Sequence, residues 1–410
     1  MDADGNFVVN GRPFLLIAGQ KVDYAWWDAA GYTRGQADLK LGQLRAAGVN
    51  TIDLGNWFGA PYQDQALWNQ FGFYWIGSAV LDGQGHNAQG DWTAARQITA
   101  IVNEFKARPN LLRWYVATEL NPEVADQKGW RSSYAAAVTT IRAADPAHPV
   151  VGDLTVFAGA ATEWLTPSLN QAPLIEEALG YPSTGITIQH LLDALLAMNT
   201  AWQRGQRFVA GISATPIPEL DRPLPPDFSG PSRSELRRFF LWPVALNVKA
   251  FEVLWGANQR GYRGGRSGDS TLPPAALRVW KDTLDTLSEV KSLESVILAP
   301  GRFVPLATAP AFRIGGVDNN VRPLYGIYAA KKVVGRDVYV VAVNANEAGP
   351  AAGVPRGYDD TRVDGARIDV GVPIAAAVRI PDTGAVSSAG STITDSFDPM
   401  ATHVYKITPR

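Results

Sequence analysis

The stretch Leu111-Leu-Arg-Trp-Tyr-Val-Ala-Thr-Glu-Leu-Asn-Pro-Glu123 is the most informative part of the sequence. Its apolar and aromatic residues are typical of a buried strand, and Asn121-Pro122 ends the strand because proline cannot donate to a sheet. Glu119 therefore lies at the end of a buried strand, where partial burial favours the protonated carboxyl group. Such a group can act as a general acid. In the alternative interpretation, Glu119 caps the next helix or pairs with an arginine.

The composition argues against several classes of protein. The chain has 410 residues, which suits two domains, and 46% of them are apolar, enough for a sizeable core. The formal net charge is -2 and no basic stripe is present, so we expect no nucleic-acid partner. No apolar run approaches about 18 residues, so we expect no membrane span. Cysteine is absent and the histidines lack metal-ligand spacing, so we expect no metal and no cofactor.

The start of the chain bears on its location. It begins Met1-Asp-Ala-Asp-Gly5, without an apolar leader. We expect a secreted or periplasmic protein whose signal peptide has been removed, and a cytoplasmic location is the alternative. The sequence makes no prediction of the oligomeric state.

Short apolar strands alternate with amphipathic helices from residue 13 to about residue 257. Expected strands lie at 13–19, 49–54, 71–76, from 111 onward, 149–154, 174–180, 207–213 and 249–255. Expected helices lie at 38–47, where Gly48 ends the helix, from the Asp91 cap to about Lys106, and at 133–143, 188–202, 232–247 and 275–293. A capping box, Ser232-x-x-Glu235, opens the helix at 232–247. Eight such units in about 290 residues predict a closed (β/α)8 TIM barrel. No glycine-rich phosphate loop follows the first strand, which disfavours a nucleotide-binding fold.

The pattern changes after Pro300-Gly301 to alternating apolar and polar residues. Expected strands at 324–330, 336–344, 366–370 and 402–407 predict an antiparallel β-sandwich. We therefore predict two domains, a barrel at residues 1–297 and a β-sandwich at residues 298–410. His403 lies within a short strand, and we interpret it as structural.

Tryptophan is abundant, with 13 residues. Several lie in expected loops near the ends of strands: Trp26, Trp27, Trp57, Trp68 and Trp92. Flat aromatic faces suit the apolar faces of sugar rings, because indole combines a large apolar area with one hydrogen-bond donor. Packing in the core is the default role of a tryptophan, but repeated tryptophan residues beside strand ends are less easily explained in that way.

Several segments resemble the clan A glycoside hydrolases. They are the opening 7–19, the segment 44–53 entering the second expected strand, Trp114-Tyr-Val-Ala-Thr-Glu119, Tyr181-Pro182, Trp255, and the C-terminal 395–405. The resemblance covers nearly the whole chain. It implies a barrel enzyme that carries a C-terminal β-sandwich and acts on a carbohydrate substrate.

The resemblance also implies a set of site residues. Glu119 would be the general acid/base, and the expected substrate-binding residues are Asp53, Trp57, Asn121, Asp153, Tyr181 and Trp255. The family places a second glutamate at the end of the seventh strand, where this sequence has Ser213. The residue before Glu119 is Thr118, where the family prefers asparagine.

Three options remain for the second carboxylate. Glu219, in the proline-rich stretch 216–226, could act as the nucleophile of a retaining enzyme, which needs two carboxylates about 5–5.5 Å apart. Asp53, Asp153 or Glu252 could instead be the nucleophile, or the base of an inverting enzyme with a gap of about 6.5–9.5 Å. If Trp255 faces the barrel interior, alternation makes Glu252 face the helices. In the third option, the site binds glycans without cleaving them.

The sequence therefore predicts a glycoside hydrolase acting on a poly- or oligosaccharide, with Glu119 and Glu219 as its catalytic pair. The main alternative is a non-catalytic glycan-binding or scaffold protein of the same fold. A barrel enzyme with a non-sugar substrate is less consistent with the abundance of tryptophan and the missing phosphate loop.

Overall fold

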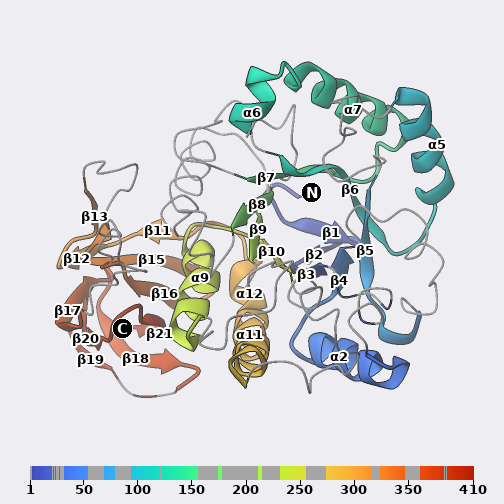
Figure 1. Cartoon of the computed structure of the whole chain (residues 1–410). Coiled ribbons are helices and arrows are strands. Elements are labelled where there is room, and N and C mark those ends of the chain that lie inside the picture. Colours follow the sequence, from blue (N-terminus) through green and yellow to red (C-terminus); the bar gives the residue numbers. More distant parts are fainter. Residues whose placement is uncertain are drawn as a thin grey trace, which may run out of the picture.

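A closed barrel and a β-sandwich make up the molecule (Figure 1). The computed structural model describes residues 2–20, 22, 24, 27, 32–53, 69–78, 94–120, 122–155, 174–177, 211–214, 231–254, 274–315, 324–346, 361–382, 384 and 386–410. The fold class predicted from the sequence is confirmed. The positions of the two domain boundaries remain a prediction.

Eight parallel strands form the barrel. They are β3 (Leu16–Gln20), β4 (Thr51–Asp53), β5 (Tyr74–Ser78), β6 (Leu111–Leu120), β7 (Val150–Thr155), β8 (Leu174–Glu177), β9 (Gly211–Ala214) and β10 (Ala250–Leu254). Pairing runs around the ring in chain order, and β10 closes it against β3. Each strand matches one of the strands expected from the sequence.

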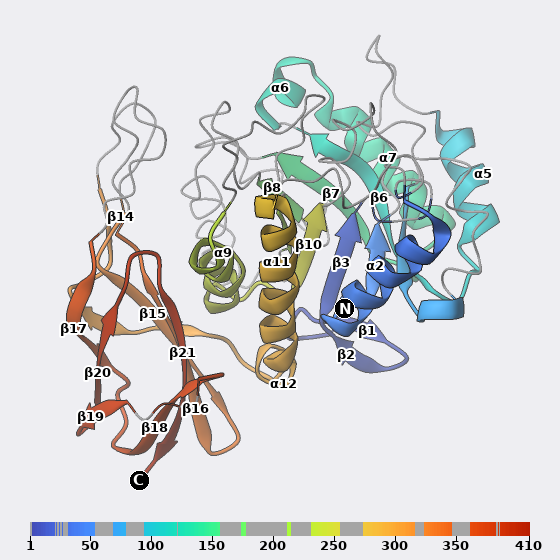
Figure 2. The same cartoon turned by 60° about the horizontal axis from the view of Figure 1, so that its bottom comes forward.

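Helices pack outside this ring (Figures 1 and 2). The described helices are α2 (Arg34–Ala46), α5 (Ala95–Phe105), α6 (Pro122–Gln127), α7 (Arg131–Ala144), α9 (Arg233–Ala245), α11 (Pro274–Ser292) and α12 (Glu294–Ile297). The predicted capping box opens α9, because the Ser232 side chain accepts from the Glu235 amide while the Glu235 carboxylate accepts from the Ser232 amide. Gly48 follows α2 with a φ of +98°, as expected for the residue that ends a helix. The helix expected at 188–202 lies outside the described residues.

The N-terminal hairpin closes the end of the barrel at which the strands begin. It consists of β1 (Phe7–Val9) and β2 (Arg12–Phe14), and Figure 2 shows it beside the start of β3. Phe7 belongs to the apolar cluster of the barrel interior, together with Leu16, Leu112 and others. At the start of β10, the Lys249 ammonium group donates to the Asp4 carbonyl and to the side-chain oxygen of Asn6. These contacts hold the hairpin across the opening.

Two antiparallel sheets form the sandwich. One has the order β11 (Val304–Pro305), β15 (Ile327–Val334), β16 (Asp337–Asn344), β21 (Thr402–Pro409) and β18 (Ile374–Ile380). The other has the order β12 (Ala307–Ala309), β17 (Val363–Asp369), β20 (Thr392–Phe397) and β19 (Ser387–Ala389). A shorter pair, β13 (Arg313–Ile314) with β14 (Leu324–Tyr325), lies beside them. The predicted strand 324–330 is therefore divided at Gly326.

The central strand β16 is apolar on both faces because both faces are buried. Val340 and Ala342 belong to the core between the two sheets, whereas Val341 and Val343 belong to the cluster shared with the barrel helices. Trp242 of α9 contacts the rings of Phe312 and Tyr328 at this junction. The sandwich therefore packs directly against α9, as Figures 1 and 2 show.

A buried lysine also joins the two parts. The Lys332 ammonium group of β15 donates to the carbonyl of Ile297, the last residue of α12. Burial, together with the nearby charge of Lys249, lowers the pKa of Lys332 to about 7.

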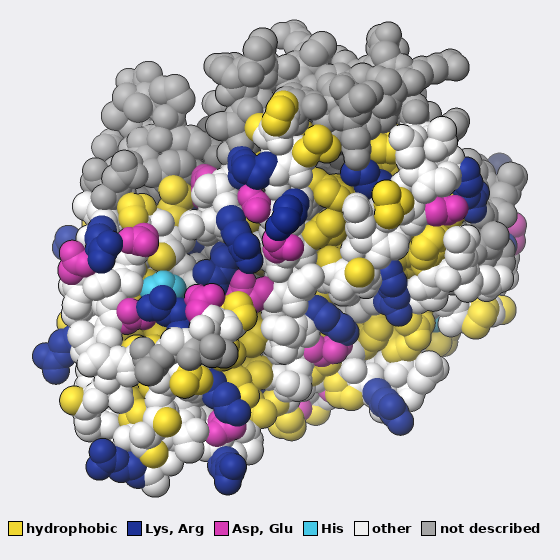
Figure 3. Space-filling view, turned by 90° about the horizontal axis from the view of Figure 1, so that it is seen from below, with side chains coloured by type: hydrophobic (Ala, Val, Ile, Leu, Met, Phe, Trp, Pro, Cys, Tyr) yellow, Lys and Arg dark blue, Asp and Glu magenta, His cyan; other side chains and the backbone are white. Residues whose placement is uncertain are grey.

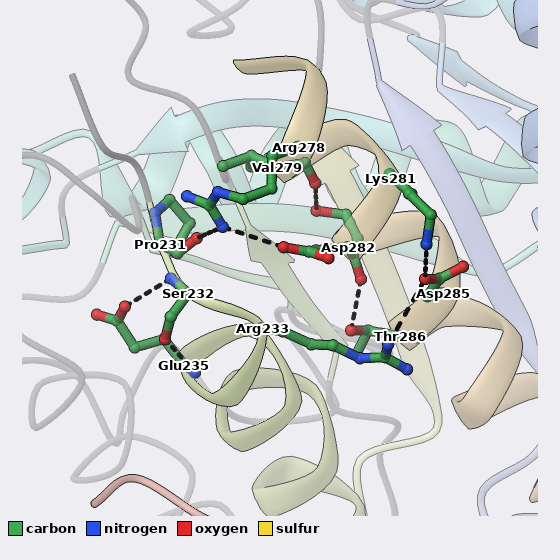
Figure 4. A network of polar contacts seen from close by, with 11 residues as sticks. Pro231, Ser232, Arg233, Glu235, Arg278, Val279, Lys281, Asp282, Asp285 and Thr286 are labelled. Atoms are coloured by element: carbon green, nitrogen blue, oxygen red, sulfur yellow. Dashed lines mark hydrogen bonds and ion pairs between the residues drawn. The ribbon is translucent and has the colours of Figure 1, made fainter. Parts of the chain in front are cut away.

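The surface of the molecule carries charges of both signs. Figure 3 shows basic and acidic side chains interspersed on the face seen from below. Figure 4 shows such side chains between α9 and α11: the Arg233 guanidinium of α9 lies 3.7 Å from the Asp285 carboxylate of α11. The Arg278 guanidinium of α11 donates to the carbonyl of Pro231, just before α9, at 3.0 Å. Among the described residues, no helix is both long and apolar enough to cross a membrane.

Gly326 is the residue at which we expect substitution to disturb the sandwich most. A Cβ atom here would lie 2.2 Å from the Ala311 carbonyl oxygen, and φ is +79°. We expect Gly326→Ala to lower the free energy of unfolding by about 3 kcal/mol or more. Gly335→Ala is the matched control: φ is also positive, at +61°, but nothing lies within 4 Å, so it should cost about 1 kcal/mol. Urea unfolding of both variants tests this, and equal losses would contradict the clash.

Candidate active site

The carboxyl ends of the barrel strands meet at one end of the molecule, because all eight strands are parallel. Three predicted site residues lie on this end: Asp53 is the last residue of β4, Glu119 the second-last of β6, and Asp153 the third-last of β7. The structure describes their backbones only. Active sites of TIM barrels lie at this end, since the loops that follow the strands converge there.

The other predicted site residues lie outside the part of the chain that the structure describes. They are Trp57, Asn121, Tyr181, Glu219 and Trp255. Their roles remain predictions.

Strand β6 is irregular just before Glu119. Tyr115 pairs with Val151, but Leu120 pairs with Leu154, so five residue steps on β6 match three on β7. The ladder shifts twice in this span, once on each side of Ala117. Bulges of this kind bend a strand and often occur next to active sites, where they re-aim a side chain. The ladder of β6 with β7 is therefore irregular in the segment that carries Glu119.

The backbone register identifies a further candidate for the second carboxylate, Glu176 of β8, which the sequence analysis did not name. Ser213 of β9, where the family has its second glutamate, is in register with Glu176 of β8 on one side and with Glu252 of β10 on the other. The Leu-Ile-Glu-Glu sequence of the weakly predicted sixth strand contained the signal, but nothing in the sequence alone sets the register between strands.

Glu252 lies in the barrel interior, and the prediction that it faces the helices is wrong. Its carboxylate accepts from the Arg113 guanidinium at 2.9 Å and from the Tyr115 hydroxyl at 2.8 Å. The side chains of Arg113 and Glu252 are 1% and 0% exposed. The neighbours Phe251 and Val253 instead pack in the cluster beneath the helices. A polar residue takes the inner position because the interior supplies its partners.

Arg113 and Tyr115 are the other polar side chains of this cluster that sequence reasoning missed. The guanidinium of Arg113 also donates to the Tyr115 hydroxyl at 3.3 Å. A signal was present: an arginine within an apolar strand, two residues from a tyrosine, requires a buried carboxylate partner. Its identity could not be found from sequence, because Glu252 is 139 residues away.

The structure decides between the two roles for one of the five tryptophans named from the sequence. Trp27 is buried in the core, edge-on to Tyr32 and Trp280, and is not available to a sugar. Trp75 and Trp114 are likewise buried beneath the helices, in edge contact with one another. Part of the high tryptophan content therefore serves packing. Trp26, Trp57, Trp68 and Trp92 lie outside the described residues.

Among the described residues, no group of His, Asp or Glu side chains could hold a metal ion. The observed contacts of His403 are with sandwich residues. Its ring stacks on Phe397, and its Nδ1 lies within hydrogen-bonding distance, 3.1 Å, of both the Asp395 carboxylate and the Tyr405 hydroxyl. Burial lowers the pKa of His403 to about 4, so the ring is neutral near pH 7. These contacts agree with the structural role expected for it.

Comparison with solved structures shows the fold of the whole chain. A glycoside hydrolase family 5 protein from Bacteroides vulgatus superposes with a TM-score of 0.59 at 14% identity, covering 100% of this chain and 92% of that one. A GH27 beta-L-arabinopyranosidase from Geobacillus stearothermophilus, in complex with arabinose, gives 0.54 at 11% identity, covering 96% and 97%. AmyP in complex with maltose gives 0.52 at 9% identity, covering 96% and 97%.

No protein-family model matches the sequence, and no curated protein does. The chain therefore shares its barrel and its C-terminal β domain with glycoside hydrolases as a fold, at identities that carry no assignment of residues.

The buried pair of Arg113 and Glu252 should dominate the stability of the barrel interior. We expect Glu252→Met alone to lower the free energy of unfolding by about 3–5 kcal/mol, because it leaves a buried charge without its partner. The double variant Arg113→Met/Glu252→Met should recover most of that loss, since an apolar pair of similar volume is often close to neutral. Urea unfolding of the single and double variants measures the coupling, and additive losses would contradict it.

Proposed function

We propose that this protein is a glycosidase that cleaves a glycosidic bond in a poly- or oligosaccharide, with Glu119 as the proton donor. The observation that supports it best is the position of Glu119, next to the end of β6 on the carboxyl-end face of a closed parallel barrel. The compared structures add support, because proteins of this fold include glycoside hydrolases and two were solved with arabinose or maltose bound.

The proposed chemistry needs two carboxyl groups with different protonation states. Glu119 transfers its proton to the glycosidic oxygen as the bond from that oxygen to the anomeric carbon breaks. The second group is ionised. It either bonds to the anomeric carbon, to be displaced later by water, or removes a proton from the attacking water. Glu219 remains the proposed second group, and Trp57, Tyr181 and Trp255 are proposed to contact the sugar. A secreted or periplasmic location would bring such an enzyme to its polysaccharide and is also a proposal.

One observation favours the second candidate function, glycan binding without cleavage. Strand β9 ends Gly211-Ile-Ser-Ala214, so the described part of the seventh barrel strand contains no carboxylate. A protein of this kind would hold sugars at the same end of the barrel without hydrolysing them.

Replacing Glu119 separates the two functions. We expect Glu119→Gln to lower turnover of polysaccharides and aryl glycosides by about 10²–10⁴-fold, because the amide cannot supply the proton. Sugar binding should be retained, since the side chain keeps its size. Steady-state assays on a substrate panel, with isothermal titration of the same sugars, measure both effects.

The control for Glu119 is Asp126→Asn, which alters an exposed carboxylate that pairs with Arg131 on the neighbouring α6–α7 segment. Its turnover should match that of the wild type. Sugar binding with no turnover by the wild type would establish the glycan-binding function instead.

The second catalytic carboxylate can be assigned by comparing the turnover of variants in which one candidate carboxylate at a time is replaced by its amide. We expect Glu219→Gln to abolish turnover to a similar extent as Glu119→Gln, because cleavage requires both groups. Asp53→Asn and Asp153→Asn should retain turnover and raise KM, since these residues are proposed to bind substrate. Full activity of Glu219→Gln, together with loss of activity in Glu176→Gln, would contradict the role of Glu219 and assign the second catalytic carboxylate to Glu176 of β8.

A further inference from the structure

We propose that Arg113, Tyr115 and Glu252 form a strut across the barrel that positions Glu119 for proton transfer. They act as positioning residues, since they hold the strand that carries the proton donor and are not proposed to touch substrate. The inference rests on the proposed glycosidase function for its catalytic consequence. Its structural basis is independent, because all three side chains lie in the described interior of the barrel.

The strut joins two strands on opposite sides of the barrel. In the ring, β6 and β10 are separated by three strands in either direction, so they are opposite one another. The hydrogen bonds from Arg113 and Tyr115 to the Glu252 carboxylate therefore span the barrel. Adjacent strands are already held by their ladders, but opposite strands are held only by side chains. This contact fixes β6 relative to β10 in a way that backbone pairing cannot.

Both strands continue from the strut toward the proposed site. Glu119 lies four residues beyond Tyr115, and the ladder of β6 with β7 shifts twice between Tyr115 and Leu120. On the other strand, β10 continues for two residues beyond Glu252 and ends at Leu254. Tyr115 is thus the last regularly paired residue before the bulged segment, and its side chain is anchored to the opposite strand. The hydrogen bond from Tyr115 to Glu252 therefore fixes the position of β6 directly before the segment that carries Glu119.

The charges of the strut also bear on Glu119. Arg113 and Glu252 together are neutral, so the interior beneath the proposed site carries no net charge from this pair. Loss of the Glu252 charge would leave the Arg113 cation below Glu119. An uncompensated cation in a barrel interior of low dielectric acts over a long range and favours the ionised form of a carboxyl group, so we expect Glu119 to lose its proton at lower pH in that case.

Two variants test the strut through kinetics. Tyr115→Phe removes the two hydrogen bonds of the hydroxyl, the one it donates to Glu252 and the one it accepts from Arg113. It keeps the aromatic ring and the ion pair, so it should fold. We expect its kcat on aryl glycosides to fall about 10–100-fold, because small displacements of a catalytic group are costly. KM should stay within about twofold, since substrate contacts are not altered. In Glu252→Gln, the alkaline limb of the profile of kcat/KM against pH should also move to lower pH, whereas in Tyr115→Phe it should not.

The matched control is the Arg237–Glu289 pair, a bidentate ion pair at 2.7 and 2.8 Å that joins α9 to α11 outside the barrel. Glu289→Gln should lower stability while leaving kcat per folded molecule and the pH profile unchanged. A purely structural role for the strut predicts the same for Tyr115→Phe. Wild-type kcat in Tyr115→Phe, together with an unmoved alkaline limb in Glu252→Gln, would therefore overturn the proposal.

Hydrogen exchange tests the strut without relying on activity. In Tyr115→Phe, amide exchange should accelerate in residues 116–120 of β6 and also in residues 252–254 of β10, although these segments lie on opposite sides of the barrel. In Glu289→Gln, neither segment should change. Acceleration confined to β6 would overturn the strut. If the wild type shows no turnover, the glycosidase proposal fails while the exchange result still decides whether the two strands are coupled.

Discussion

The positive charge of Arg113 is buried inside the barrel, and a carboxylate from the opposite strand neutralises it. An isolated charge in such an interior costs several kcal/mol, so the partner is required for the barrel to be stable. The pairing has a geometric consequence, because Glu252 reaches Arg113 only if the sheet is closed and β10 presents Glu252 inward. Phe251 and Val253 then face the helices, and the orientation of the whole strand follows from one ion pair.

Closure also determines where a substrate could bind. The hairpin β1–β2 and the contacts of Lys249 with Asp4 and Asn6 occupy the end at which the strands begin. The carboxyl ends of the strands lie at the other end, and Asp53, Glu119 and Asp153 are all near these ends. The sandwich packs on α9 and buries the second face of β16, so it supports the outer layer of the barrel. Fold and proposed site therefore depend on the same parallel arrangement.

The barrel and the sandwich could be predicted from the sequence because their signals are local. Strands of apolar residues, the capping box at Ser232 and the glycine at Gly48 each depend on near neighbours. The orientation of Glu252 was predicted wrongly. Alternation along a strand gives the direction of one side chain only if the direction of another is known, and the prediction assumed without evidence that Trp255 faces the barrel interior. The partner of Arg113 and the register of Glu176 depend on pairings between distant segments, which a single sequence does not contain.

A crystal structure of Glu119→Gln with a bound oligosaccharide would test the proposed role of Glu119 most directly. We expect a sugar chain lying across the carboxyl ends of the barrel strands, with the side chain of residue 119 about 3 Å from the glycosidic oxygen, as proton transfer requires. A second carboxylate should face the anomeric carbon. A sugar bound elsewhere, or residue 119 turned away from the bound chain toward an arginine, would contradict that role.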